Sequence, residues 1–151
     1  MPTLLDTSVL VRLRDKDSAE HADCASLLRS LDFAIHDRVL CAQVLIEYWV
    51  VATSPRNVNG LGLTPAEANA DLSDFLSLIP CLPEPPDVLA RWRELVTTTG
   101  TRGRPAHDAR LVAVMDAFGI NDLITLNAEH FRRFDRVRCH TPADALPPPP
   151  V

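Results

Sequence analysis

The stretch Thr3-Leu4-Leu5-Asp6-Thr7-Ser8 decides how the fold of this chain begins. Its apolar start predicts a short strand over residues 2–6, and the residues that follow predict a short helix over 7–14. A strand that runs directly into a helix is the opening unit of an α/β fold. Asp6 then stands just after a strand, and ligands in parallel sheets bind at the carboxyl ends of strands.

The rest of the chain repeats this alternation of strands and helices. Thr64-Pro65-Ala66-Glu67 is a strong helix start, because it combines an N-cap threonine, a first-turn proline and a glutamate at the capping-box position. We expect helices over residues 18–31, 43–53, 64–77 and 87–98 and from Asp108, and strands near 38–41, 78–81, 123–126 and 137–140. The order predicts a three-layer α/β domain over residues 1–146 with a mainly parallel central sheet flanked by helices, and a Pro-rich tail over 147–151.

Composition places the chain among globular proteins, since 46% of its 151 residues are hydrophobic and 23% are charged. No basic region followed by an apolar run opens the sequence, and the longest apolar run is too short to span a bilayer. We therefore expect a soluble, cytoplasmic protein with no membrane partner. The net charge of −5 argues against a general nucleic-acid coat protein but leaves room for a local basic groove.

The four cysteines form no CxxC pair, and none has a histidine at the spacing of a zinc site. We expect free buried thiols in a reducing compartment, although the even number also permits an oxidising location. These residues are Cys24, Cys41, Cys81 and Cys139.

Two further acids stand on apolar helix faces. Glu47 interrupts the most hydrophobic stretch of the chain, residues 44–51, and Asp108 opens a helix that continues with an apolar stripe. An ionised carboxylate on such a face is costly unless a cation meets it, and no Lys or Arg stands beside Asp6, Glu47 or Asp108 in an obvious pairing. Each acid alone has an ordinary explanation as a cap or an ion-pair partner, but a cap does not explain mid-helix Glu47. Together the three acids indicate a shared divalent metal.

Four segments in this order resemble the PIN domain family, and most of all the VapC-type toxins of bacterial toxin–antitoxin pairs. They are Leu4-Leu5-Asp6-Thr7-Ser8, Val44-Leu45-Ile46-Glu47, residues 107–113 and residues 123–131. The resemblance implies a Rossmann-like PIN fold and an endoribonuclease that depends on Mg²⁺ or Mn²⁺. It also implies an RNA substrate, a small antitoxin protein as partner and a homodimer.

Carried over position by position, the resemblance makes Asp6, Glu47 and Asp108 the catalytic, metal-binding acids. It makes Ser8 and Thr125 hydroxyl groups that order the site. Asn127 stands where many family members have a fourth aspartate, and Glu129, two residues on, is a candidate replacement that acts directly or through a water.

The chemistry fits these residue types, because Mg²⁺ and Mn²⁺ prefer carboxylate oxygens. Such an ion lowers the pKa of a bound water and neutralises charge on the scissile phosphate. The residue types by themselves thus indicate metal-assisted phosphodiester hydrolysis. Only the resemblance indicates RNA as the substrate and a toxin as the role.

Basic residues close to the acids are candidate substrate contacts. Arg102, Arg104 and His107 precede Asp108 and could bind phosphate, with a solvated loop as the alternative. The Glu47 helix is apolar almost all round, so it must be covered on more than one side. A homodimer or an antitoxin peptide would explain this, and core packing alone is the explanation we favour from sequence.

Two rival functions remain. In the first, the absent fourth acid has disabled cleavage, and the chain is a catalytically silent PIN-like module that binds RNA or protein. In the second, the chain is a receiver-like domain with a phosphorylated aspartate, which requires a lysine after a late strand. The only lysine is Lys16, so the receiver-like function ranks low.

Overall fold

The computed structural model describes residues 2–29 and 38–146. Within them a five-stranded sheet has the order β3-β2-β1-β4-β5, and every neighbouring pair is parallel. The predicted α/β architecture is therefore confirmed, and the sheet is wholly rather than mainly parallel. The strands are β1 (Thr3–Leu5), β2 (Arg38–Cys41), β3 (Cys81–Leu82), β4 (Asp122–Ile124) and β5 (Arg138–His140).

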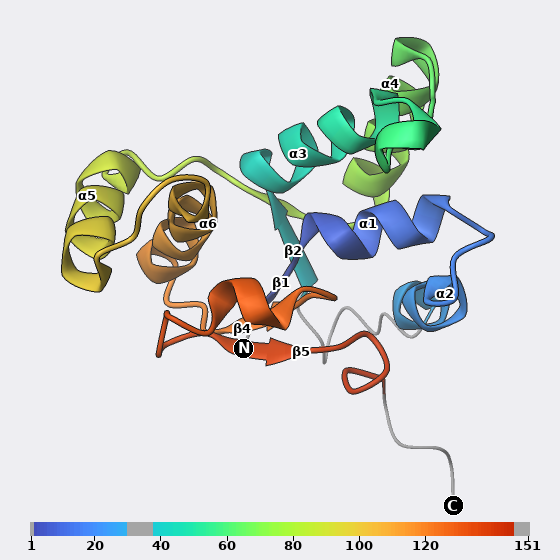
Figure 1. Ribbon diagram of the computed structural model, residues 1–151. Coiled ribbons are helices and arrows are strands. Elements are labelled where there is room, and N and C mark those ends of the chain that lie inside the picture. The colour runs from blue at the N-terminus through green and yellow to red at the C-terminus, as the bar shows by residue number, and fades with distance from the viewer. Residues whose placement is uncertain (1, 30–37, 147–151) are drawn as a thin grey trace, which may run out of the picture.

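Six α-helices connect these strands, and Figure 1 shows α5 and α6 side by side on the left, with α1, α3 and α4 on the other side of the strands. The helices are α1 (Thr7–Arg14), α2 (His21–Arg29), α3 (Ala42–Thr53), α4 (Pro65–Leu78), α5 (Val88–Thr99) and α6 (Pro105–Ala117). Two 3₁₀ turns, η1 (Arg56–Val58) and η2 (Ala128–Phe131), complete the described chain. None of the helices in residues 2–29 and 38–146 is both long and apolar enough to cross a membrane.

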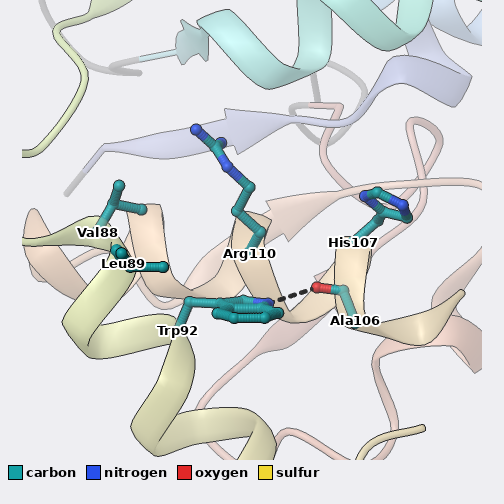
Figure 2. A pocket seen from close by; sticks show the side chains of 6 residues that line it. All are labelled: Val88, Leu89, Trp92, Ala106, His107 and Arg110. Carbon is teal, nitrogen blue, oxygen red and sulfur yellow. Dashed lines mark hydrogen bonds between the residues drawn. The ribbon is translucent and has the colours of Figure 1, made fainter. Parts of the chain in front are cut away.

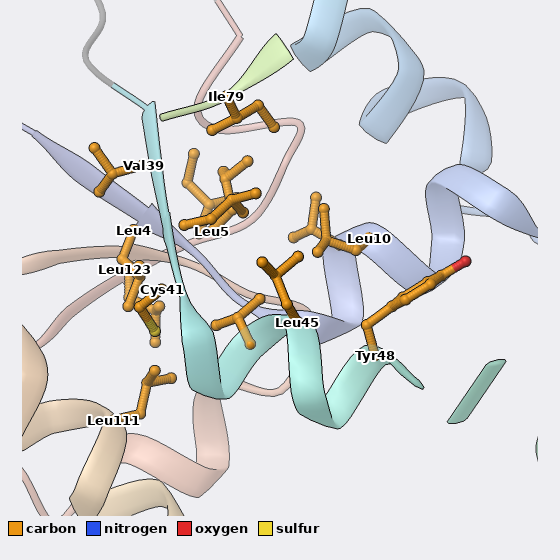
Figure 3. Packing of buried hydrophobic residues seen from close by; sticks show 14 of the residues in the cluster. Leu4, Leu5, Leu10, Val39, Cys41, Leu45, Tyr48, Ile79, Leu111 and Leu123 are labelled. Carbon is orange, nitrogen blue, oxygen red and sulfur yellow. The ribbon is translucent and has the colours of Figure 1, made fainter. Parts of the chain in front are cut away.

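The central strand β1 is buried on both of its faces. Successive side chains of a strand point to opposite faces, and Figure 3 shows Leu4 with Leu111 of α6 on one side and Leu5 with Leu10 of α1 on the other. Both leucines are almost fully buried. Helices on both faces thus fix the position of β1, and with it the position of the residue that follows, Asp6.

Three predicted boundaries change in the structure, and the first is the start of α6, which lies at Pro105 and not at Asp108. The strand predicted at 78–81 forms as β3 at Cys81–Leu82 instead, because α4 continues to Leu78 and the Ile79 N–H still donates to the Phe75 carbonyl. The helix predicted from residue 18 begins at His21 instead, since Ser18 accepts the Glu20 N–H in a local turn before the helix. Its predicted last residues, 30–31, and the tail at 147–151 lie outside the described residues.

The capping box of α4 is confirmed. The Thr64 side chain accepts a hydrogen bond from the Glu67 N–H, and the Glu67 carboxylate accepts one from the Thr64 N–H.

The cysteines are all free, but only Cys24 and Cys41 are buried as expected, whereas Cys81 on the edge strand β3 is exposed.

The apolar helix α3 is only partly covered by the core. Val44 and Tyr48 are fully buried, but the side chains of Ile46 and Val50 are 64% and 58% exposed. Core packing alone therefore does not cover this helix, and our favoured explanation from sequence was wrong. Ile46 and Val50 are four residues apart, so they lie on the same face of α3.

Candidate functional site

Asp6 occupies the carboxyl end of β1 and the N-cap position of α1. Its backbone N–H donates to the Ile124 carbonyl at 2.9 Å, which fixes it against the neighbouring strand β4. Its Oδ2 accepts hydrogen bonds from Thr125 Oγ1 at 2.7 Å and Ser8 Oγ at 3.0 Å. Asp6 is only 7% exposed, so its carboxylate needs hydrogen-bond donors from the protein. The two hydroxyl groups supply them and hold the carboxylate in one orientation.

The two hydroxyl groups are themselves held by the backbone after β4. The Leu126 N–H donates to Ser8 Oγ and the Asn127 N–H donates to Thr125 Oγ1, each at 3.0 Å. Residues that follow two neighbouring parallel strands therefore form one network at the carboxyl edge of the sheet. Both hydroxyl groups that donate to the Asp6 carboxylate, those of Ser8 and Thr125, belong to this network.

Glu47 reaches the same edge from the middle of α3. Its Oε1 accepts a hydrogen bond from Gln43 Nε2 at 3.0 Å, and its Oε2 lies 3.3 Å from Thr7 Oγ1. The Thr7 hydroxyl has one proton and lies closer to the Val44 carbonyl, at 3.0 Å, so its bond to Glu47 is the weaker. Burial is the main cause that raises the pKa of Glu47, and the charges of Asp6 and Asp108 raise it further, against the lowering effect of Gln43 and Thr7.

Asp108 lies in the first turn of α6. Burial is again the main cause that raises its pKa, and the Asp6 carboxylate raises it further. The nearby charges of His130, Arg133 and His107 lower it in part. In the described part of the chain, none of the three carboxylates forms an ion pair within 4.0 Å.

The three acids line one cavity of about 260 Å³. Its other lining residues are Thr7, Ser8, Val11, Arg12, Val51, Asn59, Leu126, Asn127, His130 and Phe131. Across residues 2–29 and 38–146, no three His, Cys, Asp or Glu side chains form a ready-made metal site. The donor chemistry fits Mg²⁺ or Mn²⁺, which accept carboxylates and keep several waters, but the acids share a cavity without forming a finished ligand shell.

Five of the predicted site residues do not line this cavity: Thr125, Glu129, Arg102, Arg104 and His107. Thr125 still contacts a cavity acid, because its hydroxyl group bonds to Asp6. The Glu129 side chain is 59% exposed and lies 3.9 Å from His130 Nε2, outside the lining of the cavity. Arg102 and Arg104 lie in the loop before α6, and both are exposed. Sequence proximity to a site residue was the basis for the assignments of Glu129, Arg102 and Arg104, and all three side chains are exposed outside the cavity lining.

His107 lines a different cavity, of about 310 Å³, between α5 and α6. Figure 2 shows Trp92 of α5 next to α6, with its indole N–H bonded to the Ala106 carbonyl at 2.8 Å. Arg110 extends away from Trp92 in the same view. The side chain of His107 thus belongs to the lining of the α5–α6 cavity, whereas its neighbour Asp108 lines the acidic one.

Several residues at the acidic cavity were not predicted from the sequence. Gln43 and Thr7 bond to Glu47, and His130 lines the cavity on the side of Asp108. Gln43 was detectable, because it precedes Glu47 by four residues and so shares its helix face. His130 carries no such pattern, since the 3₁₀ turn η2 is what brings it to the cavity.

The fold is similar to solved structures of toxin–antitoxin proteins. VapC20 of Mycobacterium tuberculosis, described as a toxin that cleaves the sarcin–ricin loop, is 20% identical with a TM-score of 0.64 over 85% of this chain and 92% of that one. VapBC-1 of nontypeable Haemophilus influenzae is 14% identical with a TM-score of 0.69 over 94% and 98% of the two chains. VapBC2 of Rickettsia felis, bound to promoter DNA, is 18% identical with a TM-score of 0.66 over 93% and 98%.

Among curated protein sequences, no relative of this chain was detected. The family model described as "PIN domain" matches residues 3–137, which include β1 with Asp6, the Glu47 helix, the start of α6 with Asp108 and the turn after β4. At this coverage the match establishes the family, and the chain belongs to the PIN domain family.

Proposed function

We propose that this protein is an endoribonuclease that depends on Mg²⁺ or Mn²⁺, and that it is the toxin of a two-component toxin–antitoxin pair. The observation that carries the nuclease proposal is a set of three carboxylates that line one cavity at the carboxyl edge of the sheet and form no ion pair within residues 2–29 and 38–146. The PIN family and the similarity to VapC20 support RNA as the substrate class.

In this proposal Asp6, Glu47 and Asp108 hold the ion. When bound, the ion lowers the pKa of water and neutralises negative charge that builds on the scissile phosphate. Ser8 and Thr125 keep the Asp6 carboxylate turned into the cavity, because each donates a hydrogen bond to its Oδ2.

The ion also supplies the positive charge that the cavity needs. Glu47 and Asp108 are half-buried and lie near Asp6, and burial together with this repulsion raises their pKa values, so folding disfavours the ionised form of each. A divalent ion held by these acids would reverse this preference, since it would stabilise ionised carboxylates that have no ion pair among the described residues. We expect binding of the ion to draw the three acids together from their positions around the cavity.

The direct test is cleavage of single-stranded RNA with Mn²⁺ and with excess chelator, by the unchanged protein and by Asp6→Asn. We expect cleavage by the unchanged protein with Mn²⁺ alone. RNA binding without cleavage under all conditions would instead support the catalytically silent module. A thermal melt adds a readout independent of activity, because Mn²⁺ at 100 times its Kd stabilises a protein that binds it only when folded by about 2.7 kcal/mol.

The toxin role rests on the solved complexes with similar folds, which are VapBC and FitAB assemblies. The proposed partner is a small antitoxin that places an Arg or Lys in the acidic cavity, and the proposed location of both proteins is the cytoplasm. The exposed side chains of Ile46 and Val50 on α3 are the proposed surface for a second copy or for the antitoxin.

Expression of the protein alone tests this role. We expect it to slow growth of a bacterial host, and we expect Asp6→Ala to relieve the defect. A growth defect that persists unchanged in Asp6→Ala would contradict toxicity through RNA cleavage and indicate misfolding or overload.

A further inference from the structure

Gln43 joins the two helices that carry acids of the cavity. It lies on α3, one turn before Glu47, and it is 7% exposed. Its Nε2 donates to Glu47 Oε1 at 3.0 Å and to the His107 carbonyl on α6 at 2.8 Å. A primary amide has two N–H groups, so each of these acceptors receives its own proton.

The orientation of this amide follows from its three partners. Gln43 Oε1 accepts a hydrogen bond from the Arg110 guanidinium at 2.9 Å, on the side opposite the two acceptors. A rotated amide would place its oxygen against a carboxylate and a carbonyl, and its N–H groups against a guanidinium. All three contacts would then be repulsive, so Arg110 and Glu47 together permit a single orientation.

Arg110 is held in turn by a second acid, because its guanidinium also pairs with Glu84 in the connection before α5. Figure 2 shows the Arg110 side chain extended from α6, away from Trp92. The network therefore runs from the surface acid Glu84 through Arg110 and Gln43 to the cavity acid Glu47.

The His107 carbonyl belongs to the peptide bond that leads into Asp108. A hydrogen bond to this carbonyl fixes the backbone from which the Asp108 side chain projects, while the other N–H of the same amide fixes Glu47. One buried side chain thus bonds to one acid and to the backbone next to a second acid, and the two acids come from different helices. Among the described residues, two hydrogen bonds that involve side chains join α3 to the start of α6. They are the bond from Gln43 to the His107 carbonyl and the bond from Arg110 to Gln43.

We propose that Gln43 is a positioning residue, which sets the distance between Glu47 and Asp108 and so makes the cavity able to hold a divalent ion. This inference rests on the proposed metal-dependent function and adds a residue that acts through the acids without touching ion or RNA. Loss of hydrogen-bonding partners of metal ligands typically reduces metal affinity or activity about 10–100-fold.

The test measures Mn²⁺ affinity by calorimetry and RNA cleavage for the unchanged protein, Gln43→Met and Arg110→Met. Methionine keeps the length of Gln43 but has no N–H, so we expect Mn²⁺ affinity to fall about 10–100-fold. We expect kcat at limiting Mn²⁺ to fall in parallel, while the KM for RNA stays unchanged. Arg110→Met keeps Gln43 but removes the donor that orients it, so we expect a smaller loss in the same direction.

Tyr48→Phe is the matched control, because it removes one hydrogen bond from the same helix, to Asp71 at 2.5 Å, away from the cavity. We expect it to lower the melting temperature and leave Mn²⁺ affinity intact. If Gln43→Met does not fold, Arg110→Met, whose side chain is partly exposed, decides alone.

The outcomes separate the two proposals. If the unchanged protein binds Mn²⁺ and cleaves RNA, and both variants bind Mn²⁺ as tightly, the positioning role of Gln43 is overturned and the proposed function stands. If the unchanged protein neither binds Mn²⁺ nor cleaves RNA, the proposed function fails and the role of Gln43 fails with it. Weaker Mn²⁺ binding in both variants but not in Tyr48→Phe supports the proposal.

Discussion

The acids of this protein fall into two groups with opposite surroundings. Asp122, at the start of β4, accepts two hydrogen bonds from Arg138, at 2.8 and 2.9 Å, and lies 2.8 Å from His140 Nε2. These partners lower its pKa. Glu47 and Asp108, at the other end of the sheet, have no ion pair within the described residues, and burial raises their pKa values.

The first group stabilises the folded protein through ion pairs, whereas the second group lowers its stability. Asp116 belongs to the first group with Asp122, because Arg91 and Arg136 both pair with it. Among the described residues, arginines thus pair with these surface acids, and none forms an ion pair with the three cavity acids. Partly buried carboxylates without a cation are unfavourable for folding, and in the proposed function a bound divalent ion offsets this cost.

The largest expected effect is the loss of RNA cleavage when an acid of the cavity is substituted, compared with the substitution of a paired surface acid. We expect Asp108→Asn to reduce RNA cleavage more than about 100-fold, beyond the range for loss of a ligand's hydrogen-bonding partner. The metal-free variant should melt at the same temperature as the unchanged protein or higher, because it removes charge repulsion. Cleavage assays and thermal melts in chelator measure both effects.

Asp122→Asn is the matched control for that exchange. It should keep full cleavage but melt at a lower temperature, since it loses its charged contacts with Arg138. An Asp108→Asn variant with full activity, or an Asp122→Asn variant as inactive as Asp108→Asn, would remove the distinction between the two groups.

A second, smaller effect concerns pH. The folded pKa of Glu47 is raised above its ordinary value of 4.5, so its favourable contribution is fully present below pH 4.5 and is lost as pH rises through the folded pKa. Glu47→Gln should therefore stabilise the metal-free protein at neutral pH, and this gain should shrink as pH falls toward 4.5. Urea unfolding at a series of pH values measures it.

Asp122 should show the reverse dependence. Its folded pKa is lowered from 3.8, so its contribution is present above pH 3.8 and is lost as pH falls through the folded pKa. The loss of stability in Asp122→Asn should thus be complete at neutral pH and shrink in acid. Parallel pH profiles for Glu47→Gln and Asp122→Asn would contradict the contrast between the two groups.

The smallest expected effect concerns Asn127, which lines the cavity and lacks the charge of a fourth acid. An amide oxygen can bind Mg²⁺ but adds no negative charge, so we expect weak binding of the ion. Asn127→Asp should tighten Mn²⁺ binding and slightly lower metal-free stability, because it adds a carboxylate to the cavity. Calorimetric titration of both proteins with Mn²⁺ decides this, and unchanged or weaker binding would rule out Asn127 as a ligand.

Local sequence pattern predicted the elements that carry the acids. The apolar run before Asp6 and the capping box at Thr64 each specify structure through neighbouring residues, and the order of strands and helices indicated a parallel sheet. Asp6 could therefore be placed at the edge of the sheet, because the position needs only the end of a strand.

The details of the site could not be read from local pattern. Thr125 bonds to Asp6 across 119 positions of the sequence, and Gln43 bonds to the His107 carbonyl across 64. Such contacts depend on how strands and helices pack. Glu129 shows the converse, since a residue two positions from Asn127 faces solvent once η2 has formed. The exposure of Ile46 and Val50 likewise reflects packing that an apolar sequence does not reveal.

The position of a bound ion tests the central claim most directly. A crystal of the unchanged protein soaked in Mn²⁺ should show an anomalous density peak in the acidic cavity, within ligand distance of Asp6, Glu47 or Asp108 or of waters that they hold. The peak should be absent from an Asp6→Asn crystal soaked in the same way. Mn²⁺ bound at another site with none in this cavity, or an equal peak in Asp6→Asn, would contradict the assignment of these carboxylates as the metal-binding acids.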